Sequence, residues 1–336
     1  MITRARAPTR LDLAGAWTDV PPYSGRSGGA VVSVAIALYA HAVVHRRRGG
    51  VRLHALDYGA TVAARRASEL PAGGDLALLT AAAKRLGPRG DFELTTRADY
   101  PPGSGLGGSG AMGVAVVAAL AAARGKTPLP AEVAQAAHRL ETVDAGIAGG
   151  KQDQYSAALG GVQYLEFADP AVSATRLDVP FACLRELEQH LVLCYAGASR
   201  FSGGTIARVM ERYASGDAAV TAALDGLKAC AVRMRAALLL GDVGAVGELL
   251  AENWRHQRAL DPAMETTAMR RLAEAAARLG VRGWKACGSG AGGCLVLLAR
   301  PGEEHALGEA LRAAGGTVLR YTFDAVGVEA WTSEER

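Results

Sequence analysis

Cysteine is scarce in this chain, and the cysteines that are present form no recognisable pattern. Among 336 residues there are 5 cysteines, at positions 183, 194, 230, 287 and 294, and no pair is spaced as CxxC. Because their number is odd and their spacing irregular, neither a disulfide framework nor a zinc site is predicted. Unpaired cysteines are typical of a reducing compartment, so we predict a cytoplasmic protein.

The chain also lacks a strong excess of one charge and a long hydrophobic run. Its 37 basic and 33 acidic residues give a net charge of +4, which is too balanced to predict a nucleic-acid-binding surface. The longest apolar run, residues 30–44, is shorter than the roughly 20 residues of a transmembrane helix and is rich in β-branched residues. No apolar segment follows the charged residues 1–15, so neither a signal peptide nor a membrane partner is predicted.

What the chain does contain is ample apolar content, 50% of residues, and enough length for two domains or one large one. Periodicity predicts strands at 2–14, 30–45, 51–56, 91–98, 160–167, 190–197, 283–287, 293–299, 317–323 and 325–331. It predicts helices at 75–86, 109–123, 131–145, 152–159, 203–214, 217–240, 243–258, 262–280 and 303–314. Residues 168–189 are polar and irregular, which places a domain junction there and suggests domains 1–175 and 176–336. Strands and helices are grouped rather than alternating, which favours an α+β fold.

Glycine is concentrated in one stretch, Asp99–Leu120, with the sequence DYPPGSGLGGSGAMGVAVVAAL. Six glycines fall between positions 103 and 113, directly before an apolar helix. Gly-rich turns that lead into a helix N-terminus bind anions, usually phosphate, through backbone N–H groups and the helix dipole. The alternative is a flexible connection between two elements, which a run this rich in glycine disfavours.

Three common phosphate-binding motifs do not fit this stretch. Gly103, Gly105 and Gly108 match GxGxxG, but no second strand and no acidic residue follow at the distance that a dinucleotide-binding unit needs. A P-loop requires Lys and then Ser or Thr after its second glycine, and here Ser109 and Gly110 follow Gly108. The protein-kinase signatures HRD and DFG are absent. A phosphate-binding loop of another lineage is therefore predicted.

Three segments in order along the chain identify that lineage: RAPTRLDLAGAWTD (6–19), PPGSGLGGSGA (101–111) and KACGSGAGG (285–293). Together they resemble the three motifs of the GHMP small-molecule kinases. Segments 13–31, 149–167 and 199–203 are most similar to the D-glycero-D-manno-heptose 7-phosphate kinases within that superfamily. The resemblance implies a ribosomal S5 domain 2-like N-terminal domain, a ferredoxin-like C-terminal domain, and ATP and Mg²⁺ as cofactors.

The resemblance also implies roles at the phosphate end of a site. The ATP phosphates would be held by the loop Pro102, Gly103, Ser104, Gly105, Leu106, Gly107, Gly108, Ser109 and Gly110. Mg²⁺ would be bound by Ser109 and Glu141, although Ser109 alone reads as a helix N-cap and Glu141 as a solvated helix residue. Asp153 matches the catalytic aspartate, and Arg10 matches the basic residue that faces the transferred group.

A second group of residues would bind the acceptor sugar. Asp19 matches an aspartate that accepts hydrogen bonds from sugar hydroxyls, and Trp17, Gln152 and Gln154 are further sugar or orienting contacts. The candidates for a phosphate already carried by the acceptor are Lys151, Arg26, Arg200 and Ser202, each of which could equally lie on the surface. In the third motif, Gly288, Ser289, Gly290 and Gly292 would support the phosphate loop without taking part in the chemistry.

The implied activity is transfer of the γ-phosphoryl group of ATP to the anomeric hydroxyl of D-glycero-D-manno-heptose 7-phosphate. Galactokinases carry Glu-His where this chain has Ala16-Trp17, which argues against galactose, and Trp17 itself is typical of L-fucokinases. Another sugar 1-kinase, fucokinase-like or specialised, is therefore the first alternative, and a non-catalytic sugar or nucleotide sensor is the second. The joint presence of Arg10, Ser109, Glu141 and Asp153 disfavours a sensor. A homodimer and a monomer are both compatible with the sequence.

Overall fold

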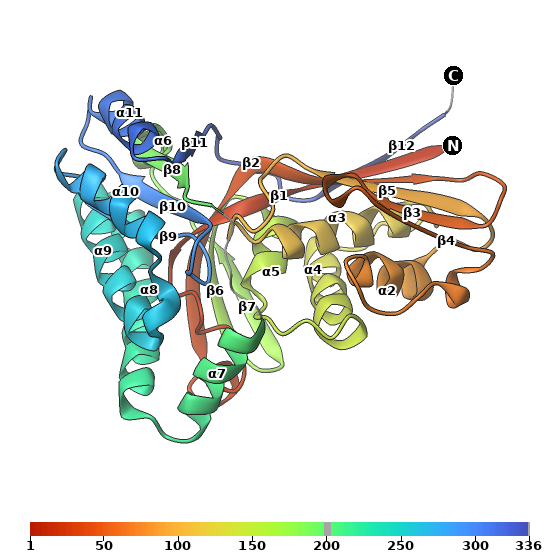
Figure 1. The fold of residues 1–336 in the computed structure, drawn as a ribbon, viewed down its shortest axis with the longest axis horizontal. Helices are drawn as coiled ribbons and strands as arrows, with labels where there is room; N and C mark the ends of the chain where they lie inside the picture. Colours follow the sequence, from red (N-terminus) through yellow and green to blue (C-terminus); the bar gives the residue numbers. More distant parts are fainter. Residues whose placement is uncertain (198–202, 335–336) are drawn as a thin grey trace.

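The computed structural model describes residues 1–197 and 203–334, and they form two sheets with helices around them (Figure 1). The larger sheet has the strand order β12-β1-β2-β5-β3-β4, with β6 paired to β2 and β7 paired to β6. All of these pairs are antiparallel except β3 with β5. Its strands are β1 (Ile2–Ala14), β2 (Gly29–His45), β3 (Val51–Ala55), β4 (Ala60–Ala64), β5 (Phe92–Ala98), β6 (Val162–Ala168), β7 (Ala171–Arg176) and β12 (Glu329–Ser333).

The smaller sheet is fully antiparallel, in the order β11-β8-β10-β9, and lies in the left half of Figure 1. Its strands are β8 (Leu191–Tyr195), β9 (Gly283–Ala286), β10 (Cys294–Leu298) and β11 (Thr317–Leu319). The helices around this sheet are α6 (Phe181–His190), α8 (Ala218–Leu240), α9 (Val243–Leu260), α10 (Thr267–Ala277) and α11 (Glu304–Ala313), and α7 (Gly203–Ala214) precedes α8. The described part of the chain contains no helix that is long and apolar enough to span a membrane.

The helices under the larger sheet place the glycine-rich loop at the centre of the molecule (Figure 1). They are α2 (Ala77–Leu86), α3 (Gly108–Ala122), α4 (Pro130–Arg139) and α5 (Gln152–Leu159), while the short α1 (Tyr23–Arg26) lies between β1 and β2. Ten residues of α3 are buried, and all but Leu120 are small or β-branched. Small side chains allow close approach between helices, and a Cβ on Gly113 would lie 3.4 Å from Cβ of Ala137 in α4. The loop before α3 is therefore held by a helix packed on all sides.

β1 connects the two halves of the core, and its burial pattern shows where the change occurs. Inward and outward positions alternate at the start of the strand, from Ile2, as expected when one face of a sheet is covered. From Ala7 onward every residue of the strand is buried. Leu11 and Leu13 pack with residues of α8 and α9, whereas Ala5 and Ala7 pack with residues of α3. The second half of β1 is thus covered on both faces, and it carries the first motif.

The structure corrects the prediction that residues 168–189 are irregular. They contain β7, whose side chains are largely exposed, and α6, which buries Cys183 and Leu187. β7 was missed because it pairs only with β6 at the edge of the sheet and has no apolar face. α6 was not predicted because most of its residues are polar and its buried face is narrow. The boundary between domains 1–175 and 176–336 stays a prediction, and β12 returns from the C-terminal half to pair with β1.

Other element boundaries also differ from the predictions. The helix predicted at 262–280 begins at Thr267, because the Thr266 hydroxyl accepts a hydrogen bond from the N–H of Met269 and caps the helix there. The helix predicted at 131–145 ends at Arg139 and continues as a π-helical turn, Leu140–Asp144. β4 and α1 were not predicted. The strand predicted at 317–323 ends at Leu319, and the strand predicted at 325–331 lies at 329–333.

Candidate active site

The glycine-rich loop forms the N-terminus of α3 through backbone conformations that favour glycine. Gly103, Gly105 and Gly107 have φ values of 66°, 71° and 75°, in the left-handed region. Leu106 is fully buried, and its carbonyl accepts a hydrogen bond from the N–H of Arg10 at 3.1 Å. The loop is therefore anchored at its centre to β1, while its flanking glycines leave the backbone open toward a ligand.

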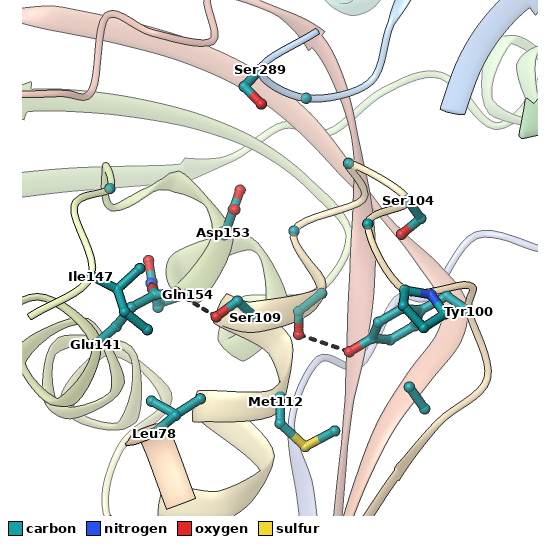
Figure 2. A pocket seen from close by; sticks show the side chains of 18 of the residues that line it. Leu78, Tyr100, Ser104, Ser109, Met112, Glu141, Ile147, Asp153, Gln154 and Ser289 are labelled. Atoms are coloured by element: carbon teal, nitrogen blue, oxygen red, sulfur yellow. Dashed lines mark hydrogen bonds between the residues drawn. The ribbon is translucent and has the colours of Figure 1, made fainter. Parts of the chain in front are cut away.

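Close packing explains the glycines at the helix start. A Cβ on Gly110 would lie 2.6 Å from Cβ of Asp153, and a Cβ on Gly108 would lie 2.3 Å from the Tyr100 ring. The Tyr100 hydroxyl donates a hydrogen bond to the carbonyl of Gly108 at 2.7 Å, as Figure 2 shows. The first turn of α3 is thus pressed against α5 on one side and Tyr100 on the other. Its N–H groups and the positive end of the helix dipole form an anion site.

Arg10 and Asp153 form an ion pair directly beside this helix start. The guanidinium contacts Asp153 Oδ1 through Nε at 3.0 Å and Nη2 at 2.8 Å. Its Nη1 donates to the carbonyl of Gly105 at 2.8 Å and to the carbonyl of Cys287 at 3.0 Å. One buried side chain therefore joins the first motif, the phosphate loop, the third motif and α5. Burial alone would lower the pKa of Arg10, but Asp153 and Asp12 outweigh it and raise the pKa, so Arg10 stays charged.

Ser109 and Glu141 are brought together from α3 and the π-helical turn after α4. The Ser109 hydroxyl donates to Glu141 Oε1 at 2.5 Å, and the Gln154 amide donates to Glu141 Oε2 (Figure 2). Burial raises the pKa of Glu141 to about 7, against the opposing effect of these two hydrogen bonds. Adjacent hydroxyl and carboxylate oxygens beside an anion site are the hard donors that Mg²⁺ prefers. The donor set therefore fits the predicted magnesium site.

At the other end of the site, Asp19 is held by the start of α5. The backbone N–H of Gln152 donates to Asp19 Oδ2 at 3.0 Å, and a Cβ on Gly150 would lie 1.9 Å from the same oxygen. Burial raises the pKa of Asp19 to about 6. Trp17, two residues earlier, is buried with φ +83°, a conformation that is rare for a bulky residue and therefore marks a constrained turn.

One cavity of about 500 Å³ brings most of these residues together. Its lining includes the phosphate end (Arg10, Pro102–Gly105, Gly107–Ser109, Glu141, Asp153) and the acceptor end (Ala16, Trp17, Asp19, Val20, Gly149, Gly150, Gln152, Ile206). Gly288 and Ser289 of the third motif also line it, whereas Gly290 and Gly292 do not. Leu106 and Gly110 belong to the loop but do not line the cavity. Asp153 lines the same cavity, packs against the loop at Gly107 and Gly110, and directly follows Gln152 in the chain.

Two basic candidates are not brought to this cavity. Lys151 is ion-paired with Asp169, whose carboxylate also accepts a hydrogen bond from Ser24, and its Nζ donates to the carbonyl of Pro170 at 3.1 Å. Arg26 is exposed, with its guanidinium 5.9 Å from the centre of the Tyr213 ring. Neither lines the cavity. Arg200 and Ser202 lie outside the described residues.

The third motif supports the phosphate loop through direct backbone contact. The N–H of Cys294 donates to the carbonyl of Ser104 at 2.7 Å, and a Cβ on Gly288 would lie 2.5 Å from the carbonyl oxygen of Gly105. The backbone at position 288 lies too close to the backbone of Gly105 for any side chain, so position 288 requires glycine. Cys287 and Cys294 are buried core residues. Burial raises the pKa of both thiols, so they stay protonated.

Sequence reasoning missed several buried polar residues around this site. Lys285 and Asp12 form an ion pair in which both side chains are fully buried, connecting β9 to β1. The position of Asp12 two residues after Arg10 was a usable signal, because alternate residues of a strand share a face. Asn253 and Gln257 of α9 contact the first and third motifs. Nothing in the helical pattern of 243–258 distinguished these two amides from surface residues.

Comparison with known proteins identifies the class to which this geometry belongs. The model of the GHMP kinases N terminal domain matches residues 75–161, and that of the GHMP kinases C terminal domain matches residues 234–317. A D-glycero-alpha-D-manno-heptose 7-phosphate kinase of Campylobacter jejuni is 30% identical over 339 residues, which cover 98% of this chain and 98% of that protein. The fold is that of the GHMP kinases, a family of small-molecule kinases that use ATP as phosphate donor. The chain belongs to the GHMP kinases, and its relatives make it a sugar kinase of that family.

Two further similarities extend this result. The L-fucokinase/L-fucose-1-P guanylyltransferase of Bacteroides fragilis is 29% identical over 331 residues, covering 89% of this chain but only 35% of that longer protein. The crystal structure of a D-glycero-D-manno-heptose 1-phosphate kinase from Bacteroides thetaiotaomicron has a TM-score of 0.81 and 28% identity, covering 99% of this chain and 100% of that chain. The predicted α+β fold of the GHMP kinases is confirmed.

Proposed function

We propose that this sugar kinase transfers the γ-phosphoryl group of ATP to the anomeric hydroxyl of its acceptor, with Asp153 as the proton acceptor. The observation that carries the proposal is the ion pair between Arg10 and Asp153 at the start of α3. Asp153 lies in the first turn of α5, where the helix dipole favours an ionised carboxylate. Its side chain is 32% exposed, so it is accessible from the cavity although Arg10 is buried.

The phosphate end supplies binding and charge stabilisation. Backbone N–H groups at the start of α3 would hold the phosphates of ATP, and the Arg10 guanidinium would offset charge that develops on the transferred group. Ser109 and Glu141 would hold Mg²⁺, which when bound neutralises charge on the phosphate oxygens. Arg10 also fixes the orientation of Asp153 by contacting the same carboxylate oxygen through two nitrogens.

The reaction balances with groups on the described residues. A bond forms between the anomeric oxygen and the γ-phosphorus, and the bond from that phosphorus to the β–γ bridging oxygen breaks, releasing ADP. The proton of the anomeric hydroxyl passes to the Asp153 carboxylate. Asp19 and Gln152 would orient the sugar through its other hydroxyl groups.

D-glycero-D-manno-heptose 7-phosphate is the proposed acceptor, because a heptose 7-phosphate kinase is 30% identical over 98% of this chain and 98% of its own length. A fucose-like sugar is the second candidate. Trp17 lines the acceptor end of the cavity and favours it, since the sequence there is typical of fucokinases. The two acceptors differ in charge, and an assay can separate them.

The test is an ADP-release assay with ATP and Mg²⁺ on five sugars: heptose 7-phosphate, free heptose, fucose, galactose and mannose. Turnover restricted to heptose 7-phosphate, with the new phosphate at the anomeric carbon by NMR, is the result expected from the end-to-end relative. Turnover of a free sugar would support the proposed kinase activity but would show that the acceptor is a sugar other than heptose 7-phosphate. ATP binding without turnover of any of the five would contradict the proposed acceptors and favour a sensor.

A further inference from the structure

The inward face of α9 carries two amides at positions where a packed helix ordinarily presents apolar side chains. Asn253 and Gln257 are one helical turn apart, and both are fully buried (0% exposed). Their neighbours on the same helix, Leu249 and Leu250, are buried apolar residues. A buried amide lowers stability unless its polar atoms find partners, so the partners of these two side chains show what they do.

Asn253 holds the turn that carries the acceptor residues. Its Oδ1 accepts a hydrogen bond from the backbone N–H of Gly15 at 2.9 Å. Gly15 has φ +94°, and a Cβ there would lie 2.0 Å from the carbonyl oxygen of Ala30, so the turn is tightly packed at its start. The following residues include Trp17 and Asp19, which both line the cavity. Asn253 therefore fixes the position of Gly15, the residue at which the turn carrying Trp17 and Asp19 begins.

Gln257 holds the turn behind the phosphate loop. Its Nε2 donates to the carbonyl of Gly288 at 2.7 Å. Gly288 packs against the backbone of Gly105, and the adjacent carbonyl of Cys287 accepts a hydrogen bond from Arg10. A shift of this turn would consequently reach both the phosphate loop and the guanidinium.

We infer that Asn253 and Gln257 are positioning residues for phosphoryl transfer, which together set the spacing between the acceptor end and the phosphate end of the cavity. The inference rests on the proposed function. Neither residue lines the cavity, and each acts through a glycine backbone in a different motif. Because both side chains extend from one helix, they hold the first and third motifs at a fixed distance from each other.

The amide chemistry suits these two contacts and is not explained by packing. One contact requires an acceptor and the other a donor, and an uncharged amide can supply either. The second polar atoms, Asn253 Nδ2 and Gln257 Oε1, are buried and have no hydrogen-bond partner among the described residues. Each such atom costs stability, so a core selected only for packing would favour apolar side chains of similar volume.

The test compares Gln257→Met with Asn253→Leu, which keep the side-chain volume and remove the hydrogen bond. Calorimetric titration with a non-hydrolysable ATP analogue and Mg²⁺ measures the phosphate end, and KM for the sugar that is turned over measures the acceptor end. We expect Gln257→Met to weaken nucleotide affinity about tenfold and leave the acceptor KM within twofold. We expect Asn253→Leu to raise the acceptor KM about tenfold and leave nucleotide affinity within twofold. Leu250→Met is the matched control, because it alters a buried side chain of the same helix and removes no hydrogen bond to either motif.

A second variant separates positioning from folding. In Gln257→Glu a protonated carboxyl group can donate to Gly288 and an ionised one cannot. Burial raises the pKa of a carboxyl group and so favours its protonated form. The nucleotide affinity of Gln257→Glu relative to wild type should therefore fall as pH rises, while Gln257→Met shows no such trend. The inference would be overturned if Gln257→Met and Asn253→Leu had lower melting temperatures but kept nucleotide affinity and acceptor KM within twofold of wild type. It would also be overturned if the two variants changed nucleotide affinity and acceptor KM equally. Failure of every sugar to react would refute the proposed function instead, and the nucleotide titration would still decide the role of Gln257.

Discussion

The phosphate end of the cavity is formed mainly by backbone groups, whereas the acceptor end is formed by side chains. The loop Pro102–Gly110 presents N–H groups and is fixed by Arg10, Tyr100 and the third motif. At the acceptor end, Asp19 and Trp17 project from a single turn, and Asp19 is held by the start of α5. The difference teaches that the proposed phosphate binding depends on the spacing of glycines along the backbone, whereas the proposed choice of sugar depends on individual side chains.

The largest effect is expected where the two ends meet, at Arg10. In Arg10→Lys a single ammonium cannot replace the contacts to Asp153, Gly105 and Cys287, so kcat should fall about 100-fold. Arg6→Lys is the matched control, because Arg6 lies on the same strand and pairs with Glu329 at 2.6 Å on the surface. Exposed pairs contribute little, so its kcat should stay within twofold. Equal kcat values for the two variants would remove Arg10 from the mechanism.

A smaller effect, confined to the phosphate end, is expected from a methyl group in the loop. Gly107→Ala would place Cβ 3.0 Å from the Asp153 carboxyl carbon, and we expect about tenfold weaker ATP binding by calorimetry. Gly125→Ala is the control, since Gly125 has a similar positive φ (+69° against +75°) but nothing within 4 Å. Both variants carry backbone strain of about 1 kcal/mol, and only Gly107→Ala should lose ATP affinity. The same affinity in both would mean that the loop does not contact ATP.

The magnesium requirement should change at Ser109. Ser109→Ala removes one proposed ligand oxygen and the hydrogen bond to Glu141. The Mg²⁺ concentration for half-maximal activity should rise about fivefold, with little change in the melting temperature. A magnesium titration that superimposes on that of the wild type would leave Ser109 only a structural role.

The smallest effect is a gain of stability at the acceptor end. Burial raises the pKa of Asp19 to about 6, compared with about 3.9 in an unfolded chain. The folded protein therefore holds this proton more tightly, and the contribution of Asp19 to stability falls as pH rises from about 4 to about 6. A shift of about two pKa units corresponds to about 3 kcal/mol, but an amide accepts the hydrogen bond from the Gln152 N–H more weakly than a carboxylate, which offsets part of this gain. Asp19→Asn should therefore be about 1 kcal/mol more stable than wild type at pH 8 and gain nothing at pH 4.

Denaturant titrations at the two pH values check this expectation, and activity serves as the second readout. The variant should bind its acceptor more weakly, because an amide is a poorer acceptor of sugar hydroxyl protons than a carboxylate. A gain in stability that is equal at pH 4 and pH 8 would contradict the ionisation argument.

The contrast between the two ends also explains what could be predicted from the sequence. The resemblance predicted that the loop, Arg10, Asp153 and the Ser109–Glu141 pair lie together, and the structure brings them to one cavity from β1, α3, α5 and the turn after α4. Their roles stay predictions. Asn253 and Gln257 were not predicted, since their role depends on how α9 packs against turns more than 30 residues away in sequence. Lys151 was wrongly grouped with the cavity residues because its pairing with Asp169 depends on where the edge of the sheet lies.

Burial patterns set a similar limit on the fold. Long elements such as β1, β2 and α8 were predicted almost to the residue, because their apolar residues repeat over many positions. β7 and α6 were missed because an edge strand and a helix with a narrow buried face carry a weak periodic signal.

The proposed phosphoryl transfer depends most on Asp153, and one paired measurement tests the role of this residue directly. ATP affinity and single-turnover ADP release are compared for wild type, Asp153→Asn and the exposed control Asp178→Asn, with the sugar that the wild type turns over. We predict unchanged ATP affinity in all three, wild-type turnover in Asp178→Asn, and turnover lowered by about 10²–10⁴-fold in Asp153→Asn. Turnover of Asp153→Asn within a fewfold of wild type would contradict the assignment of Asp153 as the proton acceptor.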